Sequence, residues 1–336
     1  MPHDGMQGSG GMTRRRFLGF LAACAAVAAA PRSVAGNGAA TLRLSGPPVA
    51  ETLPLLRLVR TGALEAQGLT AAFTPWNSPD QLRALAAGGQ IDAAVLSLAA
   101  AAVLSNRGLP VTLLALTAPP LWIVSSDPDL ESLEQLEGQT VCLPFGPGEM
   151  PELLLRALSA RTGVSYSLQH SGGGLETVLR LLLGKVRHVF LSEPAASLAV
   201  ARSRESGGVL LEKRIDIRNA WAAAFPECPL LAHGVLAMLG PMSRAQEARE
   251  VLGAAYAAEC GWVAAHPREA AALAGECYPA LAAQTVEGLV PGTDIRLVMG
   301  EAGRDASRAF LRILLEQSPE AVGGRLPGPA FWGAAG

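Results

Sequence analysis

Short apolar runs alternate with segments of helical periodicity along most of the chain. Strands are predicted where apolar runs are short, at residues 41–46, 70–76, 91–97 and 111–118. Pro79 suits the first turn of the helix between two of these runs, and Gly88 with Gly89 suits its left-handed end. Strands separated by helices of this length predict parallel pairing, and therefore an α/β sheet.

One pattern occurs twice. The segment GQIDAAVLS, from Gly89 to Ser97, matches GKVRHVFLS, from Gly184 to Ser192, at a spacing of 95 residues. The second copy belongs to another set of predicted strands, at residues 139–146, 165–171 and 186–192. Two α/β units of this kind predict two lobes.

The order of the units sets the expected boundaries of the lobes. We expect the first lobe over residues 40–121, the second over 127–231, and the completion of the first lobe with C-terminal helices over 236–336. Strand-like connectors at 121–126 and 230–239 are predicted to cross between the lobes and to form a hinge beside a cleft. We predict a loop at residues 218–229.

The N-terminus has the features of an export signal, predicted over residues 1–35. The pair Arg14 and Arg15 precedes an apolar stretch that is too short to span a bilayer. The segment resembles a twin-arginine signal peptide, which implies a periplasmic location. Small residues up to Ala35 fit signal-peptidase cleavage. An alternative lipoprotein signal would leave Cys24 as a lipid anchor.

Composition narrows the function classes. The chain has 336 residues, of which 50% are hydrophobic, so it is long enough for two packed cores. Removal of the signal leaves 23 basic and 28 acidic residues. The arginines are scattered and form no basic stripe, which argues against nucleic-acid binding.

The cysteine pattern predicts no metal. Cys142, Cys228, Cys260 and Cys277 form no Cys-x-x-Cys, and none has zinc-site spacing with a histidine. Cys228 and His233 are therefore poor candidates for metal ligands. Cys260 and Cys277 lie on neighbouring predicted helices, where either a disulfide or two free thiols fit.

Five stretches carry a family resemblance: Gly-x-x-Asp-Ala-Ala-Val at 89–95, EGQTVCLPFGPG at 137–148, LSEP at 191–194, WVAAHPREAAAL at 262–273 and GGRLPGPAFW at 323–332. Their order resembles the periplasmic solute-binding proteins of the nitrate/sulfonate/taurine and thiamine-precursor group. The resemblance implies a two-lobe type II periplasmic binding protein fold. It also implies a monomer without a cofactor, a small organic ligand, and an ABC permease with ATPase subunits as partner.

In open α/β sheets ligands collect at the carboxyl ends of strands, and these ends supply the candidate site. The ligand-binding candidates are Ser45, Pro47, Trp76, Asn77, Ser97, Phe145, Gly146, Gly148, Glu149, Ser171, Gly172, Gly173, Ser192 and Glu193. The aromatic members are expected to line an apolar pocket. The glycines allow close approach of a ligand to the backbone.

Several of these candidates have two interpretations. Ser97 and Ser192 are expected at helix N-cap positions, with or without ligand contact. Glu193 either brings a charge to one wall of the cleft or complements a helix dipole. Glu149 either accepts hydrogen bonds from a ligand amine or hydroxyl, or is a helix-start acid. The three amides after Ser171 suit an anion but lack a nucleotide P-loop ending.

No nucleophile–base arrangement stands out, so a binding protein is predicted rather than an enzyme. The alternatives are an enzyme of the same fold acting on pyrimidine or menaquinone precursors, and a sensory ligand-binding protein. The candidate loops contain no Arg or Lys, which argues against a bare anion as ligand. Two cleft acids, Glu149 and Glu193, instead suit a ligand that carries an amine.

Overall fold

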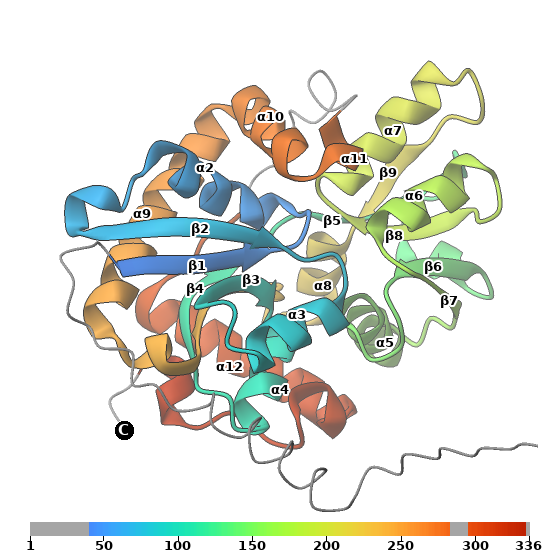
Figure 1. The fold of residues 1–336 in the computed structure, drawn as a ribbon. Coiled ribbons are helices and arrows are strands. Elements are labelled where there is room, and N and C mark those ends of the chain that lie inside the picture. The colour runs from blue at the N-terminus through green and yellow to red at the C-terminus, as the bar shows by residue number, and fades with distance from the viewer. Residues whose placement is uncertain (1–39, 283–294, 334–336) are drawn as a thin grey trace, which may run out of the picture. The chain divides into compact units, whose positions relative to one another are not determined.

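The computed structural model describes residues 40–282 and 295–333, and two mixed sheets of five strands organise this part of the chain (Figure 1). The predicted export signal and Cys24 lie outside the described residues. The first sheet has the order β2-β1-β3-β10-β4 and contains β1 (Ala40–Gly46), β2 (Leu69–Pro75), β3 (Ala93–Ser97), β4 (Val111–Thr117) and β10 (Gly234–Leu239). Strand β1 pairs in parallel with β2 and β3, whereas β10 is antiparallel to β3 and β4.

The second sheet repeats this arrangement. Its order is β7-β6-β8-β5-β9, with β5 (Leu121–Ser125), β6 (Thr140–Pro144), β7 (Ser167–Ser171), β8 (His188–Ser192) and β9 (Glu212–Asp216). Strand β6 is parallel to β7 and β8, and β5 is antiparallel to β8 and β9. The predicted repeat is confirmed, because β3 and β8 hold the same place in the two sheets. We call each sheet with the helices packed on it the first and the second lobe.

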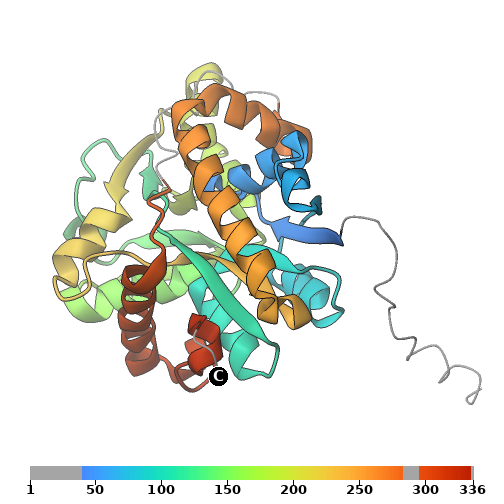
Figure 2. The same cartoon turned by 90° about the vertical axis from the view of Figure 1, so that its left-hand side faces the viewer.

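Helices flank both sheets (Figures 1 and 2). Those of the first lobe and the C-terminal region are α2 (Leu53–Thr61), α3 (Pro79–Ala87), α4 (Leu98–Asn106), α9 (Gln246–Ala265), α10 (Pro267–Cys277), α11 (Pro279–Ala282) and α12 (Gly300–Gln317). Those of the second lobe are α5 (Met150–Thr162), α6 (Gly174–Leu182), α7 (Ala195–Glu205) and α8 (Ile217–Ala224). Short 3-10 turns include η1 (Ala50–Thr52), η2 (Glu65–Gln67), η3 (Leu133–Leu136), η4 (Gly240–Arg244), η5 (Pro319–Val322) and η6 (Pro329–Trp332). Within the described ranges, none of the helices combines the length and apolarity that crossing a membrane requires.

The predicted start and end of α3 are confirmed. The helix begins at Pro79, and the Ser78 hydroxyl accepts the Gln81 N–H at 3.2 Å. Gly89 follows with a φ of 59°, in the left-handed region that glycine adopts without steric cost. The local sequence therefore fixes both ends of a helix whose first turns face the second lobe.

Three expectations are corrected. Parallel pairing holds for β1 to β3 and β6 to β8, but β10 and β5 each enter a sheet in antiparallel orientation directly after the chain crosses between lobes. The connectors predicted at 121–126 and 230–239 mostly form β5 and β10 within the sheets, and the chain crosses just before these strands, at residues 118–120 and 225–233. The predicted loop at 218–229 contains most of α8, because Asp216 accepts the Arg218 N–H at 2.8 Å and the Trp221 side chain is fully buried.

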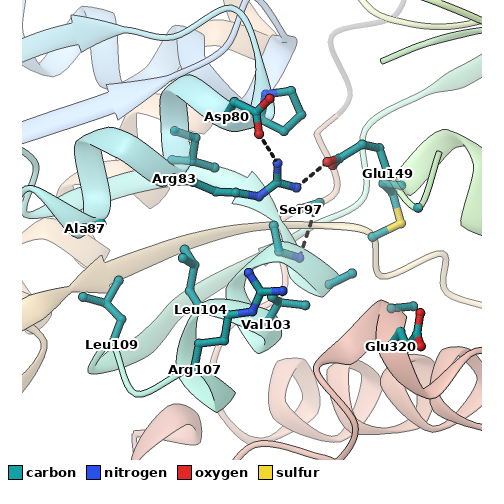
Figure 3. Close-up of a pocket in the computed structure, with 17 residues that line it drawn as sticks. Asp80, Arg83, Ala87, Ser97, Val103, Leu104, Arg107, Leu109, Glu149 and Glu320 are labelled. Carbon is teal, nitrogen blue, oxygen red and sulfur yellow. Dashed lines mark hydrogen bonds and ion pairs between the residues drawn. The ribbon is translucent and has the colours of Figure 1, made fainter. Parts of the chain in front are cut away.

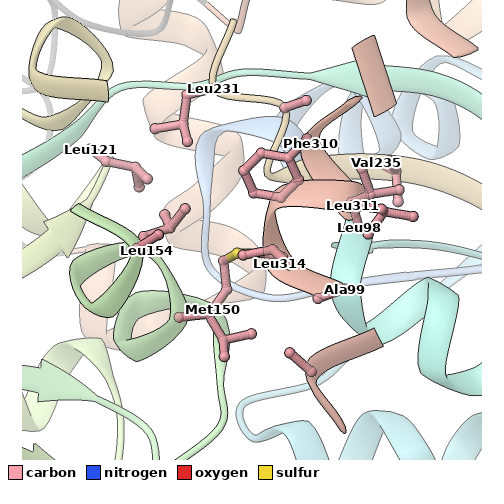
Figure 4. Packing of buried hydrophobic residues seen from close by; sticks show 14 of the residues in the cluster. Leu98, Ala99, Leu121, Met150, Leu154, Leu231, Val235, Phe310, Leu311 and Leu314 are labelled. Carbon is pink, nitrogen blue, oxygen red and sulfur yellow. The ribbon is translucent and has the colours of Figure 1, made fainter. Parts of the chain in front are cut away.

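A continuous apolar core joins the lobes beside the crossings (Figure 4). It includes Leu98 of α4, Met150 of α5 and Phe310 of α12, so α12 fills the space between a helix of each lobe. Gly234, the first residue of β10, is also closely surrounded by other atoms. A Cβ on Gly234 would lie 2.5 Å from Thr117 Oγ1 and 2.8 Å from Glu51 Oε1, which only glycine avoids. The hinge region is thus tightly packed.

Candidate functional site

The segments that follow the parallel strands of the two lobes meet across the boundary between them. Ala50 lies shortly after β1, and Glu193 lies directly after β8. The Ala50 N–H donates to the Glu193 carbonyl oxygen at 3.0 Å. A Cβ placed on Gly173, after β7, would lie 3.9 Å from the carbonyl oxygen of Asn77 and 3.7 Å from Phe145 Cε1. The strand ends of the two lobes therefore face one another in contact.

A pocket of about 620 Å³ lies beside these contacts, with walls from both lobes (Figure 3). Cavities of this volume suit small organic molecules. The first lobe contributes α3 and α4, the second lobe contributes the start of α5, and η5 supplies part of the rim. The lining residues are Pro79, Asp80, Leu82, Arg83, Ala87, Ser97, Ala99, Ala100, Val103, Leu104, Arg107, Leu109, Gly148, Glu149, Met150, Glu320 and Ala321.

Arg83 lies between two carboxylates in this pocket. Its Nη1 donates to Asp80 Oδ1 at 2.8 Å, and its Nη2 forms an ion pair with Glu149 of the second lobe (Figure 3). Burial lowers the pKa of Arg83, but the hydrogen bonds and charges of Glu149 and Asp80 outweigh it and leave the pKa raised. Arg83 is therefore neutralised by its neighbours and links the lobes.

Two other charged side chains line the pocket. Arg107, at the end of α4, and Glu320, in η5, are both exposed. Among the described residues, neither side chain forms an ion pair or a hydrogen bond, and Figure 3 shows both at the pocket. The pocket thus combines apolar walls, such as Leu104 and Met150, with one available cation and one available acid. This chemistry suits a solute with an apolar body and polar or charged ends.

Three predicted residues line the pocket: Ser97, Gly148 and Glu149. The Ser97 hydroxyl accepts the Ala100 N–H at 3.1 Å, which confirms its N-cap position and leaves its O–H free to donate. Glu149 precedes α5 without capping it. Because Glu149 pairs with Arg83, a ligand amine would have to compete with that ion pair.

The other first-lobe candidates do not line the pocket. Ser45 is fully buried and donates its hydroxyl to the Thr74 carbonyl oxygen at 2.7 Å, and Trp76 is only 6% exposed. Pro47 lies in the turn before η1, and Asn77 is exposed at the start of the loop before α3. The side chains of Ser45 and Trp76 are therefore buried in the first lobe and are absent from the pocket lining.

The glycine loop after β7 is hydrogen-bonded to a side chain of α6, the helix that follows it. The Gly172 N–H donates to Glu176 Oε2 at 2.8 Å, and this bond is the largest cause of the lowered pKa of Glu176. The Ser171 hydroxyl bonds to Thr177 Oγ1 at 2.5 Å. A free anion at Gly172 and Gly173 would have to displace a carboxylate, so the predicted anion cradle has an internal occupant.

Phe145 and Gly146 directly follow β6 of the second lobe and do not line the pocket. Phe145 is half-buried and has a φ of 70°, a conformation that costs a residue other than glycine about 1–3 kcal/mol. Its ring lies next to Gly173, as the Cβ distance above shows. Gly146 is exposed, and a Cβ added to it would meet no atom within 4 Å.

The expected role of Ser192 as an N-cap is wrong. Ser192 ends β8, and α7 begins only at Ala195. The hypothesis that Glu193 brings a charge to the cleft wall is also wrong, because its side chain is buried against Lys213, with which it forms an ion pair. Glu193 Oε2 also accepts the Ser197 N–H at 3.1 Å, which agrees with the alternative role at a helix start.

Sequence reasoning missed four charged residues that shape the site: Arg83, Arg107, Lys213 and Glu320. The candidate loops themselves contain no Arg or Lys, but Arg83 on α3 and Arg107 at the end of α4 bring cations to the pocket. The sequence could have predicted Arg83 as a site residue, because it lies one turn after Pro79 on the helix predicted to start at the cleft. Lys213 lies on β9, a strand that the apolar pattern does not reveal.

No metal site is formed in the described part of the chain, where no three His, Cys, Asp or Glu side chains gather as ligands. His233 is buried, which lowers its pKa to about 4, and its Nε2 lies 3.4 Å from the Pro119 carbonyl oxygen. Cys228 is buried, and Cys260 and Cys277 are free thiols, so the disulfide alternative is not realised.

Solved structures identify the fold. Neither a protein-family model nor a curated protein sequence matches the chain. An ABC transporter structure from Parabacteroides distasonis is 24% identical, with a TM-score of 0.67, over 87% of this chain and 98% of that one. The alkanesulfonate-binding protein SsuA from Xanthomonas axonopodis pv. citri, bound to MOPS, is 16% identical, with a TM-score of 0.63, over 88% and 99% of the two chains.

The periplasmic nitrate-binding protein NrtA from Synechocystis PCC 6803 is 15% identical, with a TM-score of 0.61, over 84% of both chains. These similarities cover nearly the whole described part of the chain. The fold is therefore the two-lobe type II fold of the periplasmic solute-binding proteins, as the sequence motifs predict.

Proposed function

We propose that the protein is a substrate-binding protein that captures a small organic solute between its lobes and delivers it to an ABC importer. The observation that carries this proposal is the pocket of about 620 Å³ that α3 and α4 of one lobe form with the start of α5 of the other. A pocket shared by two lobes changes shape when the lobes move about their crossings. The solute-binding proteins with similar structures support the same function.

The chemistry of the pocket restricts the proposed solute. Apolar walls from Leu82, Val103 and Leu104 suit a hydrocarbon body, while Arg107 and Glu320 are available for ends of opposite charge. Arg83 already has two carboxylate partners. The pocket therefore favours an amphiphilic or zwitterionic molecule over nitrate or another small bare anion.

Location and partners follow from the proposed role. The N-terminal twin-arginine segment supports export to the periplasm, with cleavage near Ala35 or, in the alternative, a lipid on Cys24. The protein would act as a monomer, and its transport partners would be a permease and the ATPase subunits of that permease. Delivery of the ligand state to a membrane receptor is the sensory alternative, and an enzyme of this fold is the other.

A ligand screen tests the proposal. Calorimetry and thermal unfolding should reveal a ligand among amino acids, betaines, pyrimidine precursors, aromatic acids, sulfonates and nitrate. A ligand at about 100 times its Kd stabilises the folded state by about 2.7 kcal/mol, which raises Tm. Ala100→Trp fills the pocket and should abolish the response.

Ala223→Trp is the matched control, because Ala223 lines a separate surface hollow on the second lobe. This variant should bind the same ligand as the wild type. The proposal is contradicted if no compound binds, or if Ala100→Trp binds as tightly as Ala223→Trp.

A further inference from the structure

One ion pair in the pocket connects the two lobes directly. Arg83 belongs to α3 of the first lobe, and Glu149 immediately precedes α5 of the second. The side chain of Arg83 is 43% exposed and that of Glu149 is 17% exposed, so both lie at the mouth of the pocket. Any motion that separates α3 from α5 must break this pair.

The pair is preorganised from the first-lobe side. Asp80 lies one helical turn before Arg83 and accepts a hydrogen bond from its Nη1 at 2.8 Å, which orients the guanidinium. The Nη2 group then points to Glu149 across the boundary (Figure 3). Because the arginine is already held, less side-chain entropy is lost when the lobes come together.

We propose that the Arg83–Glu149 ion pair is a clasp that holds the lobes closed over the pocket and so determines how long a solute is retained. The closing of the lobes is a property of the fold and can be measured without a solute. Only the consequence for retention rests on the proposed function. The two ideas can therefore fail separately.

A second contact between the lobes supplies an independent reporter. The Ala50 N–H is hydrogen-bonded to the Glu193 carbonyl oxygen at 3.0 Å, and opening the lobes removes this bond. Amide hydrogen exchange of Ala50, read by NMR on the solute-free protein, thus measures the open population. Val189 in β8 is fully buried within one lobe and reports larger unfolding only.

The experiment compares Arg83→Met, Glu149→Gln and the double variant with the wild type. Partly exposed ion pairs stabilise modestly, so each single variant should speed Ala50 exchange about two- to five-fold while Val189 stays unchanged. The double variant should exchange no faster than either single one. Raising the salt concentration should speed Ala50 exchange in the wild type but not in the double variant.

Glu227→Gln is the matched control. Glu227 pairs with Arg161 Nη2 at 2.9 Å in an exposed ion pair between distant segments, but this pair joins the second crossing to α5 and involves no residue of the first lobe. This variant should leave Ala50 exchange at the wild-type rate. The clasp is disproved if Arg83→Met and Glu149→Gln do not speed Ala50 exchange, or if Glu227→Gln speeds it equally. If a variant fails to fold, the salt test on the wild type still decides. An Ala50 exchange rate that does not change at high salt disproves the clasp as well.

Discussion

Replacing Lys213 with methionine is expected to lower the free energy of unfolding by about 3–5 kcal/mol, because the change leaves a buried carboxylate without its counter-charge. The Glu193 side chain is 4% exposed and that of Lys213 is 19% exposed, and the two form an ion pair. Lys213 Nζ also donates to Ser197 Oγ at 2.7 Å. Urea unfolding followed by circular dichroism measures the loss.

A second substitution tests whether the unpaired charge of Glu193 causes this loss. Glu193→Gln should recover part of the loss in the Lys213→Met background, because a neutral amide in place of the carboxylate needs no counter-charge. Lys185→Met is the control, because Lys185 is exposed and should lose almost nothing. A Lys213→Met protein as stable as Lys185→Met at pH 7 would disprove the importance of the buried pair.

Glu51→Gln is expected to stabilise the protein at pH 8 by about 3 kcal/mol and to leave its stability unchanged near pH 4. Glu51 follows β1 in η1, is 4% exposed, and its Oε2 has no hydrogen-bond partner within the described residues. Burial raises the pKa of Glu51 from 4.5 to about 7. Its neighbours on α9, Tyr256 and Cys260, are themselves held neutral by burial, which raises the pKa of each.

The direction follows from proton binding. Between pH 4.5 and about 7 the folded protein keeps a proton on Glu51 that the unfolded chain has lost, so this group lowers stability as the pH rises through that window. His233 acts in the opposite direction between pH 6.5 and about 4, because its pKa is lowered. The difference between variant and wild type isolates Glu51, since His233 is present in both.

The measurement is urea unfolding of Glu51→Gln and wild type at several pH values from 4 to 8. Glu65→Gln, a change at an exposed position of η2, should show no such trend. A Glu51→Gln protein whose stability parallels that of the wild type at every pH would show that the carboxyl is not held in its neutral form.

The duplicated pattern made the fold predictable. Strand ends and helix starts at Ser97 and Pro79 follow from local rules, because capping and proline geometry depend on a few neighbouring residues. Strand β9 and helix α8 escaped prediction. The β9 sequence EKRID is mostly polar, and its strand conformation depends on pairing with β5 rather than on its own pattern.

The site was less predictable than the fold, because side-chain partners come from distant segments. From the sequence Glu193 was interpreted as a cleft acid, but in the structure it is paired with Lys213 of β9. The sequence predicts no partner for Glu149 either, but in the structure it is paired with Arg83 of the other lobe. Both pairings join residues that only the folded sheets bring together. Charge counted along loops therefore overestimates the charge that a cleft offers to a ligand.

Native mass spectrometry of the protein purified from cells that produce it naturally tests the central claim most directly. The account predicts that the wild type carries one small organic molecule per chain, which is released on unfolding and is missing from Ala100→Trp produced in the same way. Wild-type protein with the mass of the polypeptide alone, or with the same bound molecule retained in Ala100→Trp, would contradict a solute held between the lobes.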